Sequence, residues 1–153
     1  MLNLFYFAVI FTVLCQSLHA APSSPGDILT SAERTHIRSV LDETKENAGR
    51  MVEIIGKVLP QLPKSPDYDE VQKNLEEFQQ IAKEFYEVKC RCRKKAMQFF
   101  DYFSQFLENY SENGVLTVEE KEAGKLLDDS GLKEMRENFQ TKKAKGEYEY
   151  LTD

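Results

Sequence analysis

A long stretch without helix-breaking residues constrains this sequence most, because residues 67–113 contain no glycine and no proline. Apolar and aromatic residues recur there at heptad spacing, which indicates an amphipathic helix. One row of the heptad holds Val71, Phe78, Phe85, Cys92, Phe99 and Phe106, and the other holds Tyr68, Leu75, Ala82, Lys89, Ala96, Phe103 and Tyr110. We interpret the aromatic stripe as hydrophobic core rather than as a ligand pocket, because aromatic side chains contribute much of the energy of protein cores.

A basic segment, Lys89-Cys90-Arg91-Cys92-Arg93-Lys94-Lys95, lies in the middle of this stretch and leaves two arrangements open. A single helix of about 44 residues would be about 66 Å long, which is too long for the core of a domain of this size. Two helices joined by a tight turn are the alternative. Crowded cations and a lysine in the apolar row favour the turn, which is therefore our prediction.

The first helix is predicted from Thr30-Ser31-Ala32-Glu33, which has the capping-box pattern. Apolar residues then continue at helical spacing to Leu59. Asn47-Ala48-Gly49 could end this helix, and Met51–Ile55 would then be able to form a short strand. Both arrangements remain open from the sequence.

Two further helix starts follow. Ser65 and Pro66 suit the N-cap and first position of the second helix, and Thr117-Val118-Glu119-Glu120 forms another capping box. The helix after it is weaker and is predicted to kink at Asp128-Asp129-Ser130-Gly131. We therefore predict an all-α, four-helix bundle over residues 30–142, followed by a polar tail over residues 143–153.

The first twenty residues predict the compartment. Leu2–Leu14 is almost wholly apolar, and small residues follow at Ala20 and Ala21. This pattern is typical of a signal peptide over residues 1–20 with cleavage after Ala20. The apolar run of about 13 residues is shorter than the ~20 that a membrane-spanning helix needs. We expect a secreted, extracellular protein that does not span a membrane, with residues 21–29 as a flexible leader.

Composition argues against several classes of function. We expect no enzyme and no cofactor. We also expect no metal site, because zinc needs three or four Cys, His or carboxylate ligands in one place. His36 is the only histidine left after the predicted cleavage. The formal net charge of −6 argues against nucleic acid as the main partner.

Cys90 and Cys92 are the cysteines that remain after that cleavage. Residues two apart point to roughly opposite sides of a helix, whereas a disulfide needs converging Cβ vectors. The pair should either bridge to a second chain, giving a disulfide-linked homodimer, or stay strained and redox-active. The surrounding cations could bind sulfated glycans or acidic partner surfaces, with a solvated turn as the alternative. These cations are Lys89, Arg91, Arg93, Lys94 and Lys95.

Residues 81–107 combine a cysteine in a basic run with Gln98-Phe99, Asp101-Tyr102 and Gln105-Phe106-Leu107. In these features the segment resembles the short-chain four-helix-bundle haematopoietic cytokines of the interleukin-5 and granulocyte–macrophage colony-stimulating factor group. The resemblance implies two crossover connections with short strands, for which Met51–Ile55 and Val115–Val118 are the candidates. It also implies that Cys90 matches a cysteine that forms an inter-chain bridge.

The resemblance implies a secreted signalling ligand for a cell-surface cytokine receptor. The family's receptor-binding acid on the first helix has no matched position, and Glu33, Asp42 and Glu43 are the neighbouring candidates for receptor contact. Asn109, in the sequon Asn109-Tyr110-Ser111, is a candidate for glycosylation. The alternative function is a secreted amphipathic-helix carrier of lipids or other hydrophobic ligands.

Overall fold

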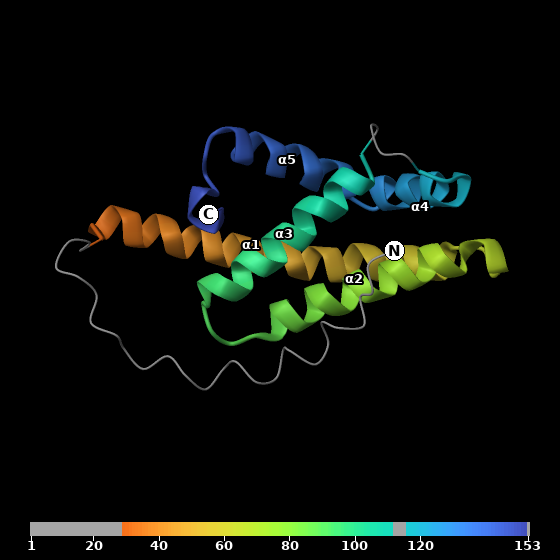
Figure 1. The fold of residues 1–153 in the computed structure, drawn as a ribbon, viewed down its shortest axis with the longest axis horizontal. Coiled ribbons are helices and arrows are strands. Elements are labelled where there is room, and N and C mark those ends of the chain that lie inside the picture. Colours follow the sequence, from red (N-terminus) through yellow and green to blue (C-terminus); the bar gives the residue numbers. More distant parts are fainter. Residues whose placement is uncertain (1–28, 112–115, 153) are drawn as a thin grey trace. The chain divides into compact units, whose positions relative to one another are not determined.

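The computed structural model of the protein describes residues 29–111 and 116–152, and these residues contain helices and no strand (Figure 1). This confirms the predicted all-α class. The fold described here is that of the unit Ala32–Asp153. The α-helices are α1 (Ser31–Val58), α2 (Asp69–Glu87), α3 (Arg93–Asn109), α4 (Val118–Asp129) and α5 (Leu132–Ala144). Short 3₁₀ turns follow or precede them at η2 (Leu59–Gln61), η3 (Pro66–Tyr68) and η4 (Glu149–Leu151).

Helix α1 runs without interruption through Asn47-Ala48-Gly49, so the possible strand at Met51–Ile55 is wrong. Met51, Ile54 and Ile55 are buried on one face of α1, which is the spacing of a helix and not of a strand. Packing of this face outweighs the weak helix propensity of the residues before it. The second proposed strand is not found either, because Val118 is the first residue of α4, while Val115 lies outside the described residues.

The uninterrupted heptad stretch forms two helices, α2 and α3, as the turn prediction required. Ser65 caps η3, and its hydroxyl accepts a hydrogen bond from the N–H of Asp67. Aromatic rings then pair between the helices, with Phe78 against Phe106 at 4.2 Å and Phe85 against Phe99 at 4.9 Å between ring centroids. The aromatic stripe is therefore core, as predicted.

The predicted kink is a complete break that separates α4 from α5. Thr117 and Glu120 form the predicted capping box at the start of α4. At the other end, Gly131 adopts a φ of 116°, which an α-helix does not contain. The weak fourth helix of the prediction is thus two separate helices.

Side-chain contacts show that α1, α2, α3 and α5 pack in antiparallel succession. Between α1 and α2, Gln79 donates to the carbonyl of Val52 at 2.9 Å. Between α3 and α5, Phe103 meets Phe139 at 5.1 Å between ring centroids. Helix α5 also lies along α1, where Lys142 pairs with Glu43 at 2.7 Å.

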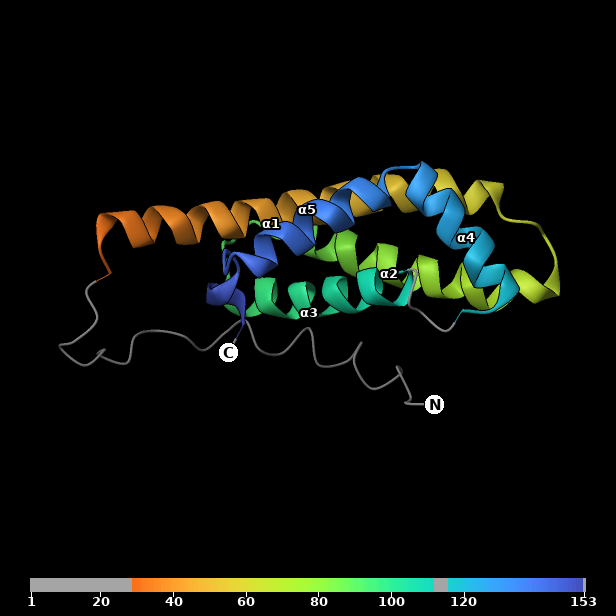
Figure 2. The ribbon, with the colours of Figure 1, turned by 90° about the horizontal axis from the view of Figure 1, so that it is seen from above.

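Figure 2 shows the same succession seen from above. Short connections at residues 59–68 and 88–92 join consecutive antiparallel helices, which leaves no room there for the overhand crossovers that the family resemblance implied.

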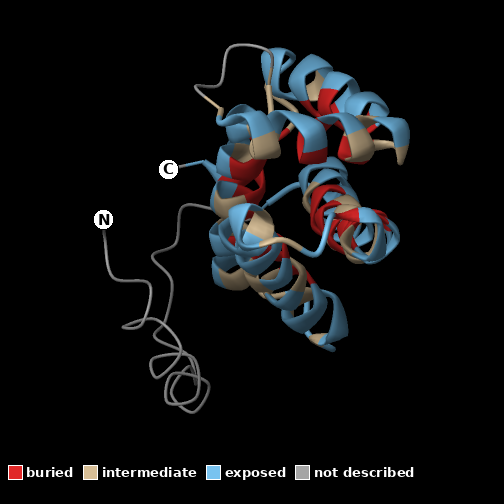
Figure 3. Cartoon of the chain, turned by 90° about the vertical axis from the view of Figure 1, so that its right-hand side faces the viewer, coloured by how far each residue is buried: buried red, intermediate tan, exposed pale blue. Residues whose placement is uncertain are grey.

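The core extends to the end of the chain, which corrects the predicted polar tail. Tyr148 is 3% exposed and Leu151 is 1% exposed, and both belong to the same buried cluster as the helices. Figure 3 shows the buried residues on the faces that the helices turn toward one another. Residues 143–153 were predicted as polar from their charged composition, but their apolar side chains fill a part of the core beside α3 and α5.

Candidate functional site

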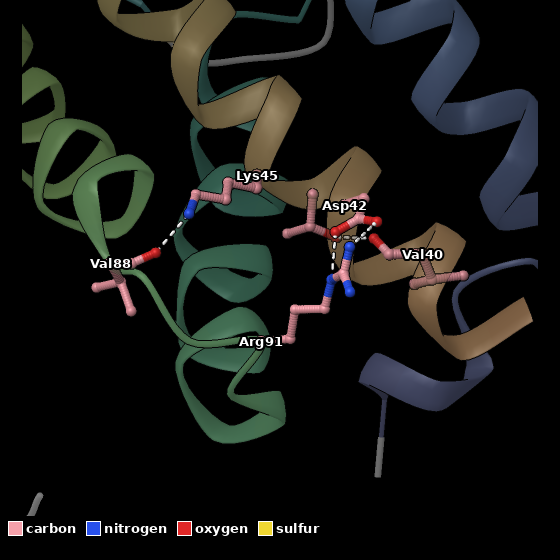
Figure 4. A network of polar contacts seen from close by, with 6 residues as sticks. Val40, Asp42, Lys45, Val88 and Arg91 are labelled. Carbon is pink, nitrogen blue, oxygen red and sulfur yellow. Dashed lines mark hydrogen bonds and ion pairs between the residues drawn. The ribbon is translucent and has the colours of Figure 1, made fainter. Parts of the chain in front are cut away.

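The basic turn, defined as residues 88–95, comprises the loop between α2 and α3 and the first residues of α3 (Figure 4). Val88 leaves α2 in an extended conformation, and Cys92 is the N-cap of α3. The Lys45 ammonium of α1 donates to the Val88 carbonyl. Two contacts thus fix the loop on α1, because Arg91 also pairs with Asp42.

The Arg91–Asp42 pair has bidentate geometry. Arg91 Nε donates to Asp42 Oδ1 at 2.7 Å, and Arg91 Nη2 donates to Asp42 Oδ2 at 2.8 Å. Such fork-to-fork pairing adds orientation to the charge attraction. The hydrogen bond to Asp42 and its charge raise the pKa of Arg91 above the usual value, so the guanidinium stays charged over the whole physiological pH range.

The two cysteines differ in exposure. Cys90 is exposed and Cys92 is half-buried, and both are free thiols. The recess beside them, lined by Leu41, Phe85 and Ala96, measures about 10 Å³. A space of that size holds at most one water molecule. The turn therefore presents thiols and charges at its surface rather than a pocket for a small molecule.

The cations of the basic turn are not equally available. Arg91 is engaged with Asp42, and Arg93 donates from Nε to the Tyr150 carbonyl at 2.8 Å. The Arg93 guanidinium also lies 4.7 Å from the centre of the Tyr150 ring, a cation–π distance. Lys89 and Lys94 are exposed, and Lys95 is half-buried. The cations predicted to bind sulfated glycans or acidic partner surfaces therefore lie in one turn, but two of them, Arg91 and Arg93, make contacts within the protein.

The predicted receptor-contact acids fall into different environments. Glu33 is exposed on the first turns of α1, and Asp42 is exposed but paired with Arg91. Glu43 is half-buried and accepts from the Lys142 ammonium at 2.7 Å and from the Tyr148 hydroxyl at 2.6 Å. Glu43 is thus part of an internal network, which the sequence analysis missed.

Comparisons add no family to this geometry. No protein-family model, curated protein or solved structure that we compared with this chain matches it.

A pattern in the sequence does indicate that the segment around Tyr148, the partner of Glu43, is buried. Tyr148 and Leu151 are three residues apart, which is the spacing of one helical face, although the acids around them suggested a solvated tail. Burial first, and then the Glu43 hydrogen bond and charge, raise the pKa of the Tyr148 phenol far above its usual value. Tyr148 therefore stays protonated and donates its hydrogen bond to Glu43.

The predicted glycosylation residue, Asn109, is exposed at the last position of α3. The next residue, Tyr110, turns inward, and its ring lies 4.9 Å from that of Phe106. Burial raises the pKa of Tyr110 to about 12, with a smaller contribution from the charge of Glu120. The sequon thus offers its asparagine at the surface while its tyrosine holds the end of α3 in place.

Residues 29–111 and 116–152 contain no group of three or more His, Cys, Asp or Glu side chains placed to hold a metal ion. Within the same ranges, no helix has the length and apolar character needed to cross a membrane. An acid-lined hollow of about 270 Å³ lies between the starts of α2 and α4, with Asp67, Glu70, Glu119 and Glu120 around it. Acids at these positions complement the positive ends of the helix dipoles.

Proposed function

We propose that the protein is a secreted, non-catalytic ligand that binds a cell-surface receptor, the role of the cytokines that residues 81–107 resemble. The observation that carries this proposal is the basic turn, which is charged and exposed yet fixed on α1 by Lys45 and Arg91. A surface that is ordered before binding loses less conformational entropy on binding, and complementary charge directs association.

In this proposal α1, α2, α3 and α5 form a four-helix bundle to which α4 is added. Their antiparallel succession differs from the up-up-down-down order of cytokine bundles with long crossovers. The proposal therefore concerns the role of a receptor ligand and does not extend to the topology or the receptor of that family.

The carrier alternative gains no support from the described surface. A lipid carrier needs a surplus of exposed apolar side chains. Among the described residues, the exposed large hydrophobic side chains are Leu29, Tyr86 and Val118. They belong to the start of the described chain, α2 and α4, and so supply no continuous apolar face.

The basic turn also supports the expected partners. Lys89 and Lys94 face solvent and could contact an acidic receptor surface or a sulfated glycan. Cys90 is exposed and could bridge to Cys90 or Cys92 of a second copy. These partners are part of the proposal.

The test is expression of the full chain in animal cells. We expect the medium to contain a protein that begins at Ala21 and shows saturable binding to a subset of cell types. Replacing Lys89 and Lys94 together by glutamate should weaken that binding by at least about tenfold, because reversed rim charges repel an acidic partner.

The matched control is Lys73→Glu, which reverses an exposed charge on α2 and should bind like the wild type. A chain that is retained in the cell would refute the secreted role. Secretion without saturable binding to any cell type would refute the receptor role. Binding that rises with lipid vesicles in place of cells would favour the carrier instead.

A further inference from the structure

The C-terminal clasp, defined as residues 146–152, folds back from the end of α5 onto α1 and α3. The Tyr148 ring lies 5.2 Å from both Phe100 of α3 and Phe139 of α5, measured between ring centroids. Leu151 is buried one turn further on. The clasp therefore covers apolar side chains of α3 and α5.

Polar contacts join the clasp to both parts of the candidate site. The Tyr148 hydroxyl donates to Glu43 Oε1 at 2.6 Å, and Glu43 Oε2 accepts from Lys142 at 2.7 Å. On the other side, Arg93 of the basic turn donates to the Tyr150 carbonyl and stacks on the Tyr150 ring. A receptor-contact candidate and a cation of the basic turn are thus both held by the same few residues.

The clasp begins at Gly146, directly after Lys145, the C-cap of α5. The Gly146 N–H donates to the Lys143 carbonyl and the Glu147 N–H donates to the Lys142 carbonyl, both at 3.1 Å. Gly146 has a φ of 72°. This is a Schellman motif with glycine in the left-handed position, and it ends α5 sharply. The preceding residue, Lys145, is exposed in the turn.

We propose that the peptide bond between Lys145 and Gly146 is a processing site for a serine protease that cleaves after basic residues. Hydrolysis consumes one water molecule, leaves a carboxylate on Lys145 and an amino group on Gly146, and releases the clasp. Exposed turns that carry small and polar residues are preferred sites of proteolytic nicking. Lys142 is a poorer site because it lies within α5 and its ammonium is paired with Glu43.

Removal of the clasp changes the candidate site directly. Glu43 loses the Tyr148 hydroxyl, and Arg93 loses both of its contacts with Tyr150. Cleavage would therefore alter the charge that the protein presents beside the basic turn. This regulatory consequence rests on the proposed function, whereas the cleavage itself does not.

The experiment is limited digestion of the native full chain with a low concentration of trypsin. Mass spectrometry measures the rate at which the peptide that begins at Gly146 is released. A protease acts on the opened clasp, so the rate follows the population of the open form. Tyr148→Phe removes a hydrogen bond to a carboxylate and should speed this cleavage by about tenfold or more. Lys145→Gln should abolish it.

The matched control is Tyr68→Phe, which removes a tyrosine–glutamate hydrogen bond, to Glu122, far along the chain from the clasp. It should leave the release of the clasp unchanged. Hydrogen exchange gives a second readout, in which Tyr148→Phe should accelerate exchange in residues 147–152 but not in α3.

Equal cleavage rates in the wild type and Tyr148→Phe, or exchange that rises in α3 to the same extent, would overturn the proposal. Equal cleavage rates would mean that the Tyr148 hydrogen bond does not hold the clasp closed. Equal exchange in α3 would mean that the segment opens only when the whole fold unfolds. Because no receptor takes part in these measurements, their failure can be told apart from a failure of the proposed function.

Discussion

At the scale of single residues, Arg136 is a charged side chain inside the core of the described unit, with 9% of its surface exposed. Its guanidinium contacts both carboxylate oxygens of Asp128, the closer at 2.6 Å, and donates to the Tyr110 carbonyl at 2.9 Å. Its Nε is buried without a partner. Arg136 thus joins the ends of α3 and α4 to α5, at the cost of keeping a charge away from water.

We predict that Asp128→Asn lowers the free energy of unfolding by about 1–3 kcal/mol, because it leaves a buried guanidinium without its counter-charge. The Asp128 side chain is one-third exposed, which keeps the effect below that of a fully buried pair. Urea unfolding followed by circular dichroism measures the change. Asp129→Asn, at the exposed neighbouring position, is the control and should stay within about 0.5 kcal/mol of the wild type. Equal effects of the two substitutions would contradict the role of Arg136.

At the scale of secondary-structure elements, the break between α4 and α5 depends on Gly131. Its φ of 116° lies outside the range that side-chain-bearing residues adopt readily. Space does not decide the residue type here, since a Cβ added to Gly131 would come no closer than 3.8 Å to Ile54 Cδ1. The requirement for glycine is therefore one of backbone conformation.

We predict that Gly131→Ala destabilises the protein by about 1–2 kcal/mol through backbone strain. The comparison is Gly124→Ala within α4, where the added Cβ would meet Tyr110 at 3.4 Å and where alanine has the higher helix propensity. Thermal unfolding of both variants should show a lower midpoint for Gly131→Ala alone. If Gly124→Ala destabilised as much, a general loss of packing, and not the conformation at residue 131, would explain the data.

At the scale of the whole molecule, two protonated tyrosine side chains connect segments that are distant in the sequence. Tyr148 ties the end of the chain to α1, and Tyr110 packs the end of α3 against α4. Both have a pKa raised mainly by burial, in the case of Tyr110 to about 12. The folded state therefore keeps these protons at a pH where the unfolded chain has lost them.

This difference predicts alkaline destabilisation. Below about pH 10, the usual tyrosine pKa, both states are protonated and the full contribution is present. Above it, the folded state binds more protons than the unfolded state, so the free energy of unfolding falls as pH rises. For Tyr110 the loss occurs between pH 10 and about pH 12. Urea midpoints at about pH 8 and about pH 11 measure it. Tyr148→Phe should show a smaller drop than the wild type, and an equal drop would exclude Tyr148 as a cause.

The success of sequence interpretation varied with the kind of signal. The cap at Thr117 was predicted correctly because a cap depends on a few neighbouring residues. Ser65 is also a cap, but of the 3₁₀ turn η3, and the N-cap of α2 itself is Tyr68. The turn at the basic cysteine pair was also predicted, since crowded cations disfavour a helix seam. The strand at Met51–Ile55 was wrong because apolar β-branched runs are compatible with either structure, and only the packing of α1 selects between them.

The candidate site was predicted in part. The basic turn and its cysteines were identified from local composition, and the structure does bring these residues together at one surface. Their partners were not predicted, because Asp42 and Lys45 on α1 and Tyr150 at the end of the chain are distant in sequence. Glu43 was chosen for receptor contact without any means of knowing that Tyr148 and Lys142 would use its carboxylate.

The sequence by itself determined the helical class, the aromatic core of α2 and α3 and the position of the turn between them, because periodicity, capping and helix breaking are local properties. Only the tertiary structure decided that α1 is continuous, that consecutive helices run antiparallel and that the acidic end of the chain belongs to the core. These features depend on which apolar faces meet, and burial against distant residues outweighs the local preferences that a sequence displays.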